Sequence, residues 1–144
     1  NLTIEESDIL QGDLTMGTAY ELAKTFIHRQ EELPTAMVIS NDIAAHGFMS
    51  CCLEAGLEIP QMMSVVSFDN IRFSSAGTAP LTTIDAHVDD MGRIAADLMV
   101  DRIRRPNKDT DRIVLSPRLV ERKSTIPYRE TKRWQKPERP KEHS

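Results

Sequence analysis

The chain has 144 residues, 40% of them hydrophobic, a net charge of −4 and two adjacent cysteines, Cys51 and Cys52. This length suffices for one domain with a buried core, and no apolar run reaches the roughly 20 residues that a membrane-spanning helix needs. Neighbouring cysteines provide no disulfide framework and the first residues lack the pattern of a signal peptide, so we predict a cytoplasmic protein without membrane contact.

The first part of the chain predicts a strand, a helix and a second strand. Residues 8–10 are a short apolar run before Gly12 and suit a strand that leads into a turn. Residues 16–30 predict a helix, because apolar side chains recur at helical spacing, with Asp13 or Thr15 as its cap. Pro34 then breaks the chain, and residues 36–40 form an apolar run of strand length.

The middle of the chain predicts a second helix between buried strands. This helix covers residues 43–55, begins after Asn41 and Asp42 and ends at Gly56, in the position that favours glycine after a helix. Residues 64–68 and 81–84 predict the next two strands. The face of the helix that we expect to be buried comprises Ala44, Phe48, Cys51, Cys52 and Ala55.

The last predicted elements are a long helix and two short strands. Residues 88–103 predict the helix, residues 113–115 a strand, and the residues around Leu119 and Val120 a further extended segment; Pro117 between them marks a sheet edge or a bulge. Apolar strands that alternate with helices predict an α/β fold in three layers, with a parallel sheet and helices on both faces. The apolar stripe of the long helix comprises Met91, Ile94, Ala95, Leu98 and Met99.

Charge divides the chain unevenly. Residues 1–100 carry four basic and fifteen acidic residues, a net charge of −11, whereas residues 101–144 carry a net charge of +7. An acidic body disfavours direct contact with nucleic acid. We predict a domain over residues 1–127 and a basic, disordered tail over residues 128–144, because the tail mixes charges and prolines without apolar periodicity.

Two predicted strands end on polar residues at the same edge of the sheet. Asn41 and Asp42 follow the strand at 36–40, and Asp69 and Asn70 follow the strand at 64–68. Ligands of open α/β sheets bind at the carboxyl ends of the strands, and a carboxylate accepts hydrogen bonds from two adjacent sugar hydroxyls. Helix capping needs one of Asn41 and Asp42 and leaves the other to point outward, and Asp69 also suits a turn. We predict that Asn41 and Asp69 contact a ligand.

The sequence carries no signature of catalysis or of a metal site. Its four histidines lack metal-ligand spacing and its cysteine pair lacks a second pair. Nucleophile-elbow, phosphate-loop and dinucleotide motifs are absent. We therefore predict a binding protein without a cofactor, and not an enzyme.

Three stretches, spread over roughly residues 8–126, together resemble the lactose and galactose repressor (LacI/GalR) family of bacterial transcription regulators. They read "PTAMVISNDIAAHGFMSCCLEAGLEIPQMMSVVSFDN", "PLTTIDAHVDDMGRIAADLMVDRI" and "LSPRLVERKST". The resemblance implies a type I periplasmic-binding-protein fold, whose two α/β lobes close on a sugar or nucleoside effector. It implies that Asn41 and Asp69 contact the effector. Leu14 stands where relatives often place an aromatic residue against the ligand, and Ala86 where some place Gln.

The resemblance also implies partners. The family's helix-turn-helix headpiece and most of its N-terminal lobe have no counterpart in these residues, so we expect operator DNA to be contacted only through the headpiece of the full-length protein. The helix at 88–103 belongs largely to that lobe, so its apolar stripe should either pack on the sheet or mediate oligomerisation. A homodimer is expected, and the family's dimer contacts correspond to His46, Phe48, Met49, Arg72, Phe73 and Gly77.

Two other interpretations remain open. A lobe of a transporter's sugar-binding protein shares the implied fold, and a flavodoxin-like or sugar-processing enzyme domain shares the α/β class. The acidic body, free cysteines and lack of a signal peptide favour the regulator over the transporter lobe. The lack of a catalytic pair or phosphate loop disfavours the enzyme.

Overall fold

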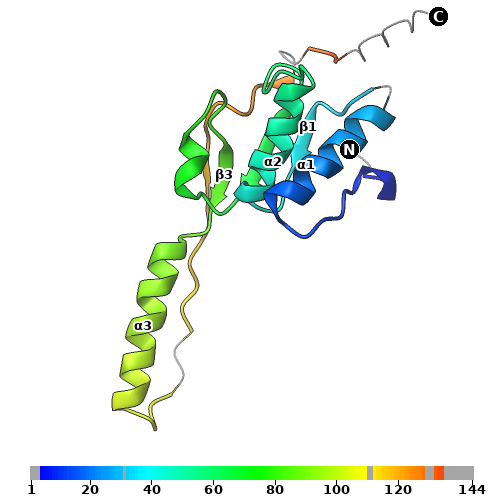
Figure 1. The fold of residues 1–144 in the computed structure, drawn as a ribbon. Coiled ribbons are helices and arrows are strands. Elements are labelled where there is room, and N and C mark those ends of the chain that lie inside the picture. The colour runs from blue at the N-terminus through cyan, green and yellow to red at the C-terminus, as the bar shows by residue number, and fades with distance from the viewer. Residues whose placement is uncertain (1–3, 31, 110–111, 129–131, 135–144) are drawn as a thin grey trace, which may run out of the picture.

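The computed structural model describes residues 4–30, 32–109, 112–128 and 132–134 (Figure 1). A lobe of two helices and a sheet forms its body, and one long helix projects from it. The elements in chain order are η1 (Glu6–Asp8), α1 (Met16–Arg29), β1 (Ala36–Val38), α2 (Asp42–Glu54), β2 (Ser64–Phe68), η2 (Arg72–Ser75), β3 (Thr82–Asp85), α3 (Val88–Arg104) and β4 (Arg118–Val120), where η marks a 3-10 helix.

The two helices of the lobe begin at capping side chains. The Thr15 side chain accepts a hydrogen bond from the backbone N–H of Thr18 at the start of α1, and the Asn41 side chain accepts one from Ala44 at the start of α2. Gly56, just beyond α2, has a φ of +74°, a conformation that glycine adopts without strain. These bounds confirm the predicted helices to within two residues.

The four strands form one sheet in the order β1-β2-β3-β4. β1, β2 and β3 are parallel neighbours, with Val38 opposite Val66 and Phe68 opposite Ile84. β4 pairs antiparallel with β3. This mostly parallel, open sheet with packed helices confirms the predicted α/β class and the predicted strands at β1, β2, β3 and β4.

Two predicted strands are wrong. The run at 8–10 lies partly in η1, and residues 113–115 adopt no regular structure. A strand needs a neighbour that accepts and donates its backbone hydrogen bonds, and the described part of the chain offers no such neighbour to either segment. An apolar run alone does not reveal whether a neighbouring strand exists.

The core lies on one side of the sheet. α1 packs against α2 and α2 against β2. The cluster between them contains the buried side chains of Ala23, Ile27, Phe48, Cys51, Cys52, Leu57, Met63 and Trp134, with Met37 and Ile39 of the β1 strand region packed against it.

No helix among the described residues packs on the opposite side of the sheet, so one of the two expected helical layers is not seen. Val38 is 72% exposed and Phe68 43% exposed. The two side chains point away from α1 and α2 because they alternate with the inward residues Met37 and Ser67 along their strands. The apolar character of β1 therefore did not indicate burial on both faces.

α3 projects away from the lobe (Figure 1), and none of its residues is buried. Met91 is 46% exposed and Met99 65% exposed. The apolar stripe does not pack on the chain's own sheet, which excludes the first of the two expected alternatives, and oligomerisation through the stripe stays a prediction. No helix among the described residues combines the length and apolarity that a membrane crossing requires.

Part of the segment predicted as a tail contacts the lobe. The backbone N–H of Lys132 donates to the carbonyl of Gln61 at 2.6 Å, and Trp134 is 9% exposed within the core cluster. An isolated Trp that follows Lys132 and Arg133 carries no periodic signal, so its packing was missed. The rest of the predicted tail, residues 129–131 and 135–144, lies outside the described residues.

Candidate functional site

The carboxyl ends of β1 and β2 meet at one edge of the sheet, which we call the carboxyl edge, and both predicted ligand residues follow it. Asn41 lies between β1 and α2, and its side chain is engaged on both sides. Its Oδ1 accepts from the backbone N–H of Ala44 at 2.8 Å, and its Nδ2 donates to the carbonyl of Leu14 at 3.1 Å. The structure thus brings Leu14 and Asn41 together, as the prediction of a shared site requires.

Asp69 stands at the tip of β2 in an uncommon backbone conformation. Its φ is +106°, and that of Asn70 is +53°; Leu14 also has a positive φ, +66°. Residues other than glycine adopt such angles at a cost of about 1–3 kcal/mol each, and they concentrate at ligand sites and switches. Asp69 is exposed, and its backbone N–H donates to the carbonyl of Ile84 at 3.0 Å.

Asp42 does not point outward, which corrects the expectation that one residue of the Asn-Asp pair is free. Asn41 caps α2, and Asp42 is fully buried. Its Oδ1 accepts from the hydroxyls of Ser67 and Thr83, the latter at 2.7 Å. Its Oδ2 accepts from the hydroxyl of Ser74 and from the backbone N–H of Ile71 at 3.0 Å. The carboxylate therefore joins α2, β2, β3 and η2.

Arg122 supports the same edge from the segment after β4, and sequence reasoning missed it. Its guanidinium donates to Asn70 Oδ1 at 2.6 Å and to the carbonyl of Leu81 at 2.7 Å. Its backbone N–H donates to Thr82 Oγ1 at 2.9 Å. No local signal distinguishes this Arg from its neighbours in "VERKST", because its partners lie at least 40 residues away.

A cavity of about 570 Å³ lies beside the carboxyl edge, between the segment before α1, α1 itself and β1. Leu14 lines it together with Leu10, Leu22 and Met37. Asn41 and Asp69 are not among the lining residues, so the predicted ligand residues surround this cavity only in part. The cavity is apolar for most of its wall.

The residues predicted for a dimer interface separate into two groups. His46, Met49 and Gly77 line a second groove of about 660 Å³ between α2 and the loop after η2, and the buried Nε2 of His46 has no hydrogen-bond partner among the described residues. Arg72 and Phe73 lie exposed on η2, outside the groove. Phe48 is 3% exposed in the core, which leaves it unavailable to a partner.

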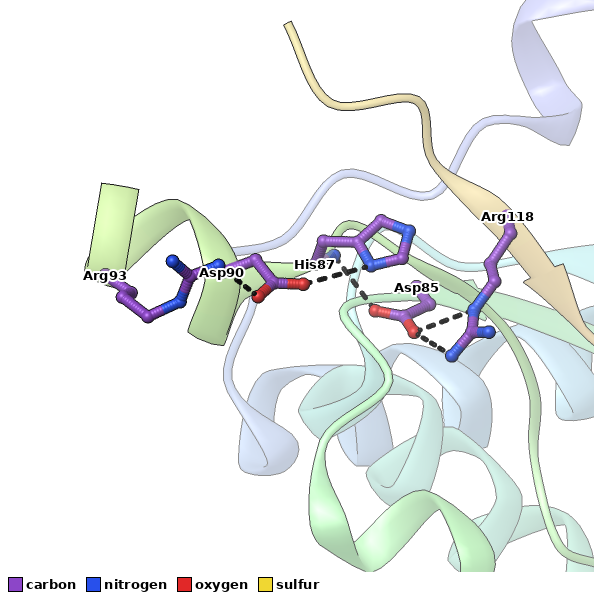
Figure 2. A network of polar contacts seen from close by, with 5 residues as sticks. All are labelled: Asp85, His87, Asp90, Arg93 and Arg118. Atoms are coloured by element: carbon purple, nitrogen blue, oxygen red, sulfur yellow. Dashed lines mark hydrogen bonds and ion pairs between the residues drawn. The ribbon is translucent and has the colours of Figure 1, made fainter. Parts of the chain in front are cut away.

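A polar network at the root of α3 was also missed (Figure 2). Asp85, at the end of β3, accepts from the backbone N–H of His87 at 2.9 Å and from the guanidinium of Arg118 at 3.0 Å. These two donors hold the pKa of Asp85 below its ordinary value of 3.8. Figure 2 shows Asp90 continuing the network from the His87 ring to Arg93. The network joins β3, which leads into α3, to β4, which brings the chain back to the sheet.

Neither cysteine has the environment of a nucleophile. Both Cys51 and Cys52 are buried. Burial raises the pKa of Cys51 and raises that of Cys52 to about 12, so both remain thiols at neutral pH. Among the described residues no group of three His, Cys, Asp or Glu side chains is placed to hold a metal ion.

The chain is similar in sequence to a family of known proteins. Residues 1–125 match the periplasmic binding protein-like domain family. The chain is 34% identical over 126 residues to the HTH-type transcriptional repressor PurR of Photorhabdus laumondii. The aligned residues are 88% of this chain and 37% of the repressor. It is 36% identical over 123 residues to PurR of Proteus mirabilis, covering 85% of this chain and 36% of that repressor.

Solved structures that are similar to this chain are also transcription regulators. A LacI family transcriptional regulator from Enterococcus faecium with bound ribose superposes with a TM-score of 0.74 at 29% identity, over 79% of this chain and 41% of that one. Its counterpart from Enterococcus faecalis, also with bound ribose, gives 0.74 at 33% identity, over 80% and 42%. The chain spans little more than a third of the sequence relatives' length. It belongs to the periplasmic binding protein-like domain family, and the relatives that it resembles are regulators of the LacI/GalR type.

Proposed function

We propose that this chain is part of the effector-binding domain of a bacterial LacI-type transcription repressor, and that Asp69, Asn41 and Leu14 contact its effector, a sugar or a nucleoside. The observation that carries the proposal is the exposed carboxylate of Asp69 at the tip of β2, held in a strained backbone conformation. Strain of this kind persists where the surrounding structure enforces it, and it is typical of ligand sites.

The chemistry of the carboxyl edge suits a polyhydroxylated ligand. The Asp69 carboxylate has lone pairs for two adjacent hydroxyls. The Asn41 amide retains one N–H and one lone pair beyond its bonds to Leu14 and Ala44. The Leu14 side chain, 54% exposed, offers an apolar surface for a sugar face or a base. The ribose named for two structural relatives belongs to this ligand class.

In the complete regulator, effector binding at this edge changes operator affinity at a distance. Such coupling requires two sites and an element with two arrangements. DNA contact resides in a part of the regulator other than this acidic lobe. The relatives named above are regulators, which favours this function over a transporter's sugar-binding lobe.

A titration of the purified chain with D-ribose tests the effector site, with other sugars and nucleosides as a panel. A ligand that binds only the native state raises the unfolding temperature with its concentration. Asp69→Ala should abolish that rise, because the acceptor for the ligand hydroxyls is lost. Asp89→Ala, an exposed acid in the first turn of α3, is the matched control and should keep it. A rise that survives Asp69→Ala unchanged removes Asp69 from the site.

We further propose that a second copy of the chain occupies the groove between α2 and the loop after η2. The buried Nε2 of His46, which has no hydrogen-bond partner in the part of the chain that the structure describes, supports this, because an unpaired buried polar atom is costly until a partner supplies a hydrogen bond. Sedimentation velocity of two variants shows whether the chain associates through the groove or through the apolar stripe of α3. Met49→Glu should prevent association and Met99→Glu should leave it intact; the reverse pattern assigns association to α3.

A further inference from the structure

The strained tip of β2 is clamped on both sides by one side chain. Asp69 and Asn70 carry the positive φ angles. Ser67, two residues before Asp69, donates its hydroxyl to Asp42 Oδ1, and the backbone N–H of Ile71, two residues after Asp69, donates to Asp42 Oδ2 at 3.0 Å. Both ends of the strained segment are therefore tied to the same buried carboxylate.

The same carboxylate is adjacent to the other half of the proposed site. Asp42 is the first residue of α2 and follows Asn41, whose side chain holds the carbonyl of Leu14. A displacement of Asp42 moves Asn41 and the ends of the Asp69 segment together. No direct bond between Asn41 and Asp69 is needed to keep the two in register.

The hydrogen-bond pattern uses both side-chain oxygens of Asp42. Asp42 accepts four hydrogen bonds, two at each oxygen, from Ser67, Thr83, Ser74 and Ile71. An Asn at this position offers one acceptor oxygen instead of two, so hydroxyls that face its NH₂ group must turn to accept, and the Ile71 N–H bonds to a neutral oxygen instead of a carboxylate, a bond roughly half as strong. All four donors are neutral. The four bonds use all the acceptor positions of the side chain, so Asp42 is fully satisfied and held in one place by four partners.

We propose that Asp42 is the positioning residue of the carboxyl edge: it sets the backbone of the Asp69 segment and couples it to Asn41 and Leu14, without contacting the ligand. This inference rests on the proposed function for its meaning, but its geometry is testable without any ligand. Arg122 also holds Asn70 through its 2.6 Å bond, so the segment should loosen, not unfold, when Asp42 is changed.

Amide hydrogen exchange of the ¹⁵N-labelled chain tests the positioning. The amides of Asp69 and Ile71 report on the segment, and those of Leu57 and Val65, bonded to Cys52 and Ser124, report on the core. Asp42→Asn should lower protection at Asp69 and Ile71 by about tenfold relative to Leu57 and Val65. Asp89→Asn, the control, should change neither. Parallel losses at segment and core show a merely structural role and overturn the proposal, as does no loss.

A milder variant covers the case in which Asp42→Asn does not fold. Ser74→Ala removes one of the four donors and keeps the carboxylate. It should lower protection at Ile71 selectively, by less than Asp42→Asn, and an unchanged ratio of segment to core protection counts against the proposal.

Binding of D-ribose forms a separate arm. If the unmodified chain binds ribose, Asp42→Asn should weaken binding although Asp42 touches no ligand, and unchanged affinity refutes the coupling to the site. If the unmodified chain does not bind ribose, ribose fails as the effector, and the exchange result decides the positioning by itself.

Discussion

Gly47 is the point at which α2 meets the start of α1, and Gly47→Ala should destabilise the lobe. A Cβ at this position would lie 2.8 Å from the carbonyl carbon of Met16 and 3.0 Å from its Cα, and closer still to its carbonyl oxygen. Ordinary carbon contacts begin near 3.5 Å, so the backbone of Met16 must move by roughly 1 Å. The obstacle is backbone, which cannot rotate out of the way as a side chain does.

The magnitude follows from three contributions. Overpacking a tight site costs about 1–3 kcal/mol. Movement of Met16 also pulls the carbonyl of Leu14, two residues earlier, from the Asn41 amide, a loss of about 1 kcal/mol. Ala in place of Gly inside a helix returns about 1 kcal/mol. We expect a net loss of about 2 kcal/mol in the free energy of unfolding.

Urea unfolding measures this loss, followed by circular dichroism and by the fluorescence of Trp134, the chain's single tryptophan, which packs on the α1–α2 core. Gly17→Ala in the first turn of α1 is the matched control, because a Cβ there meets nothing within 4 Å. It should leave stability unchanged or raise it by up to about 1 kcal/mol. A Gly47→Ala chain as stable as the Gly17→Ala chain would refute the direct packing of the α1 start on α2.

Three further predictions concern ionisable groups. The folded-state pKa of Asp85 lies below its ordinary 3.8, so its contribution is present above pH 3.8 and disappears as the pH falls through the folded-state value; in urea, Asp85→Asn should cost stability at pH 7, and the difference should vanish in strong acid. The hydrogen bond to Glu54 raises the pKa of Tyr20 from 10.0 to about 12, so its contribution is complete below pH 10 and lost as the pH rises through 12; Tyr20→Phe should remove the absorbance step near pH 12, and a step unchanged by the substitution contradicts the bond. Cys52, with a pKa of about 12, should resist a thiol reagent at pH 8 until urea unfolds the chain, and rapid native labelling contradicts its burial.

Local signals account for most of the elements. Caps at Thr15 and Asn41 and the glycine at Gly56 mark the helices of the lobe, and the apolar run of β2 coincides with the predicted strand. These features depend on residues a few positions apart. The position of Asn41 and Asp69 after neighbouring parallel strands followed from the same alternation of strands and helices.

The failures concern partners that are distant in the chain. Asn and Asp cap helices almost equally well, so the sequence alone did not show that Asn41 caps and Asp42 is buried. What decides between them is the presence of Ser67 and Thr83, 25 and 41 residues away. The strand predictions at 8–10 and 113–115 were wrong for the same reason, because strand pairing depends on a neighbouring strand and not on the segment itself.

The projection of α3 from the sheet has a mechanical consequence. With 17 residues, the helix is about 25 Å long, and its root is fixed to β3 and β4 through the Asp85 network. A rotation of that strand pair by about 10° therefore moves the far end of α3 by about 4 Å, because that end lies about 25 Å from the root of the helix. A small movement of the strands at the ion pair between Asp85 and Arg118 is therefore enlarged at the far end of α3.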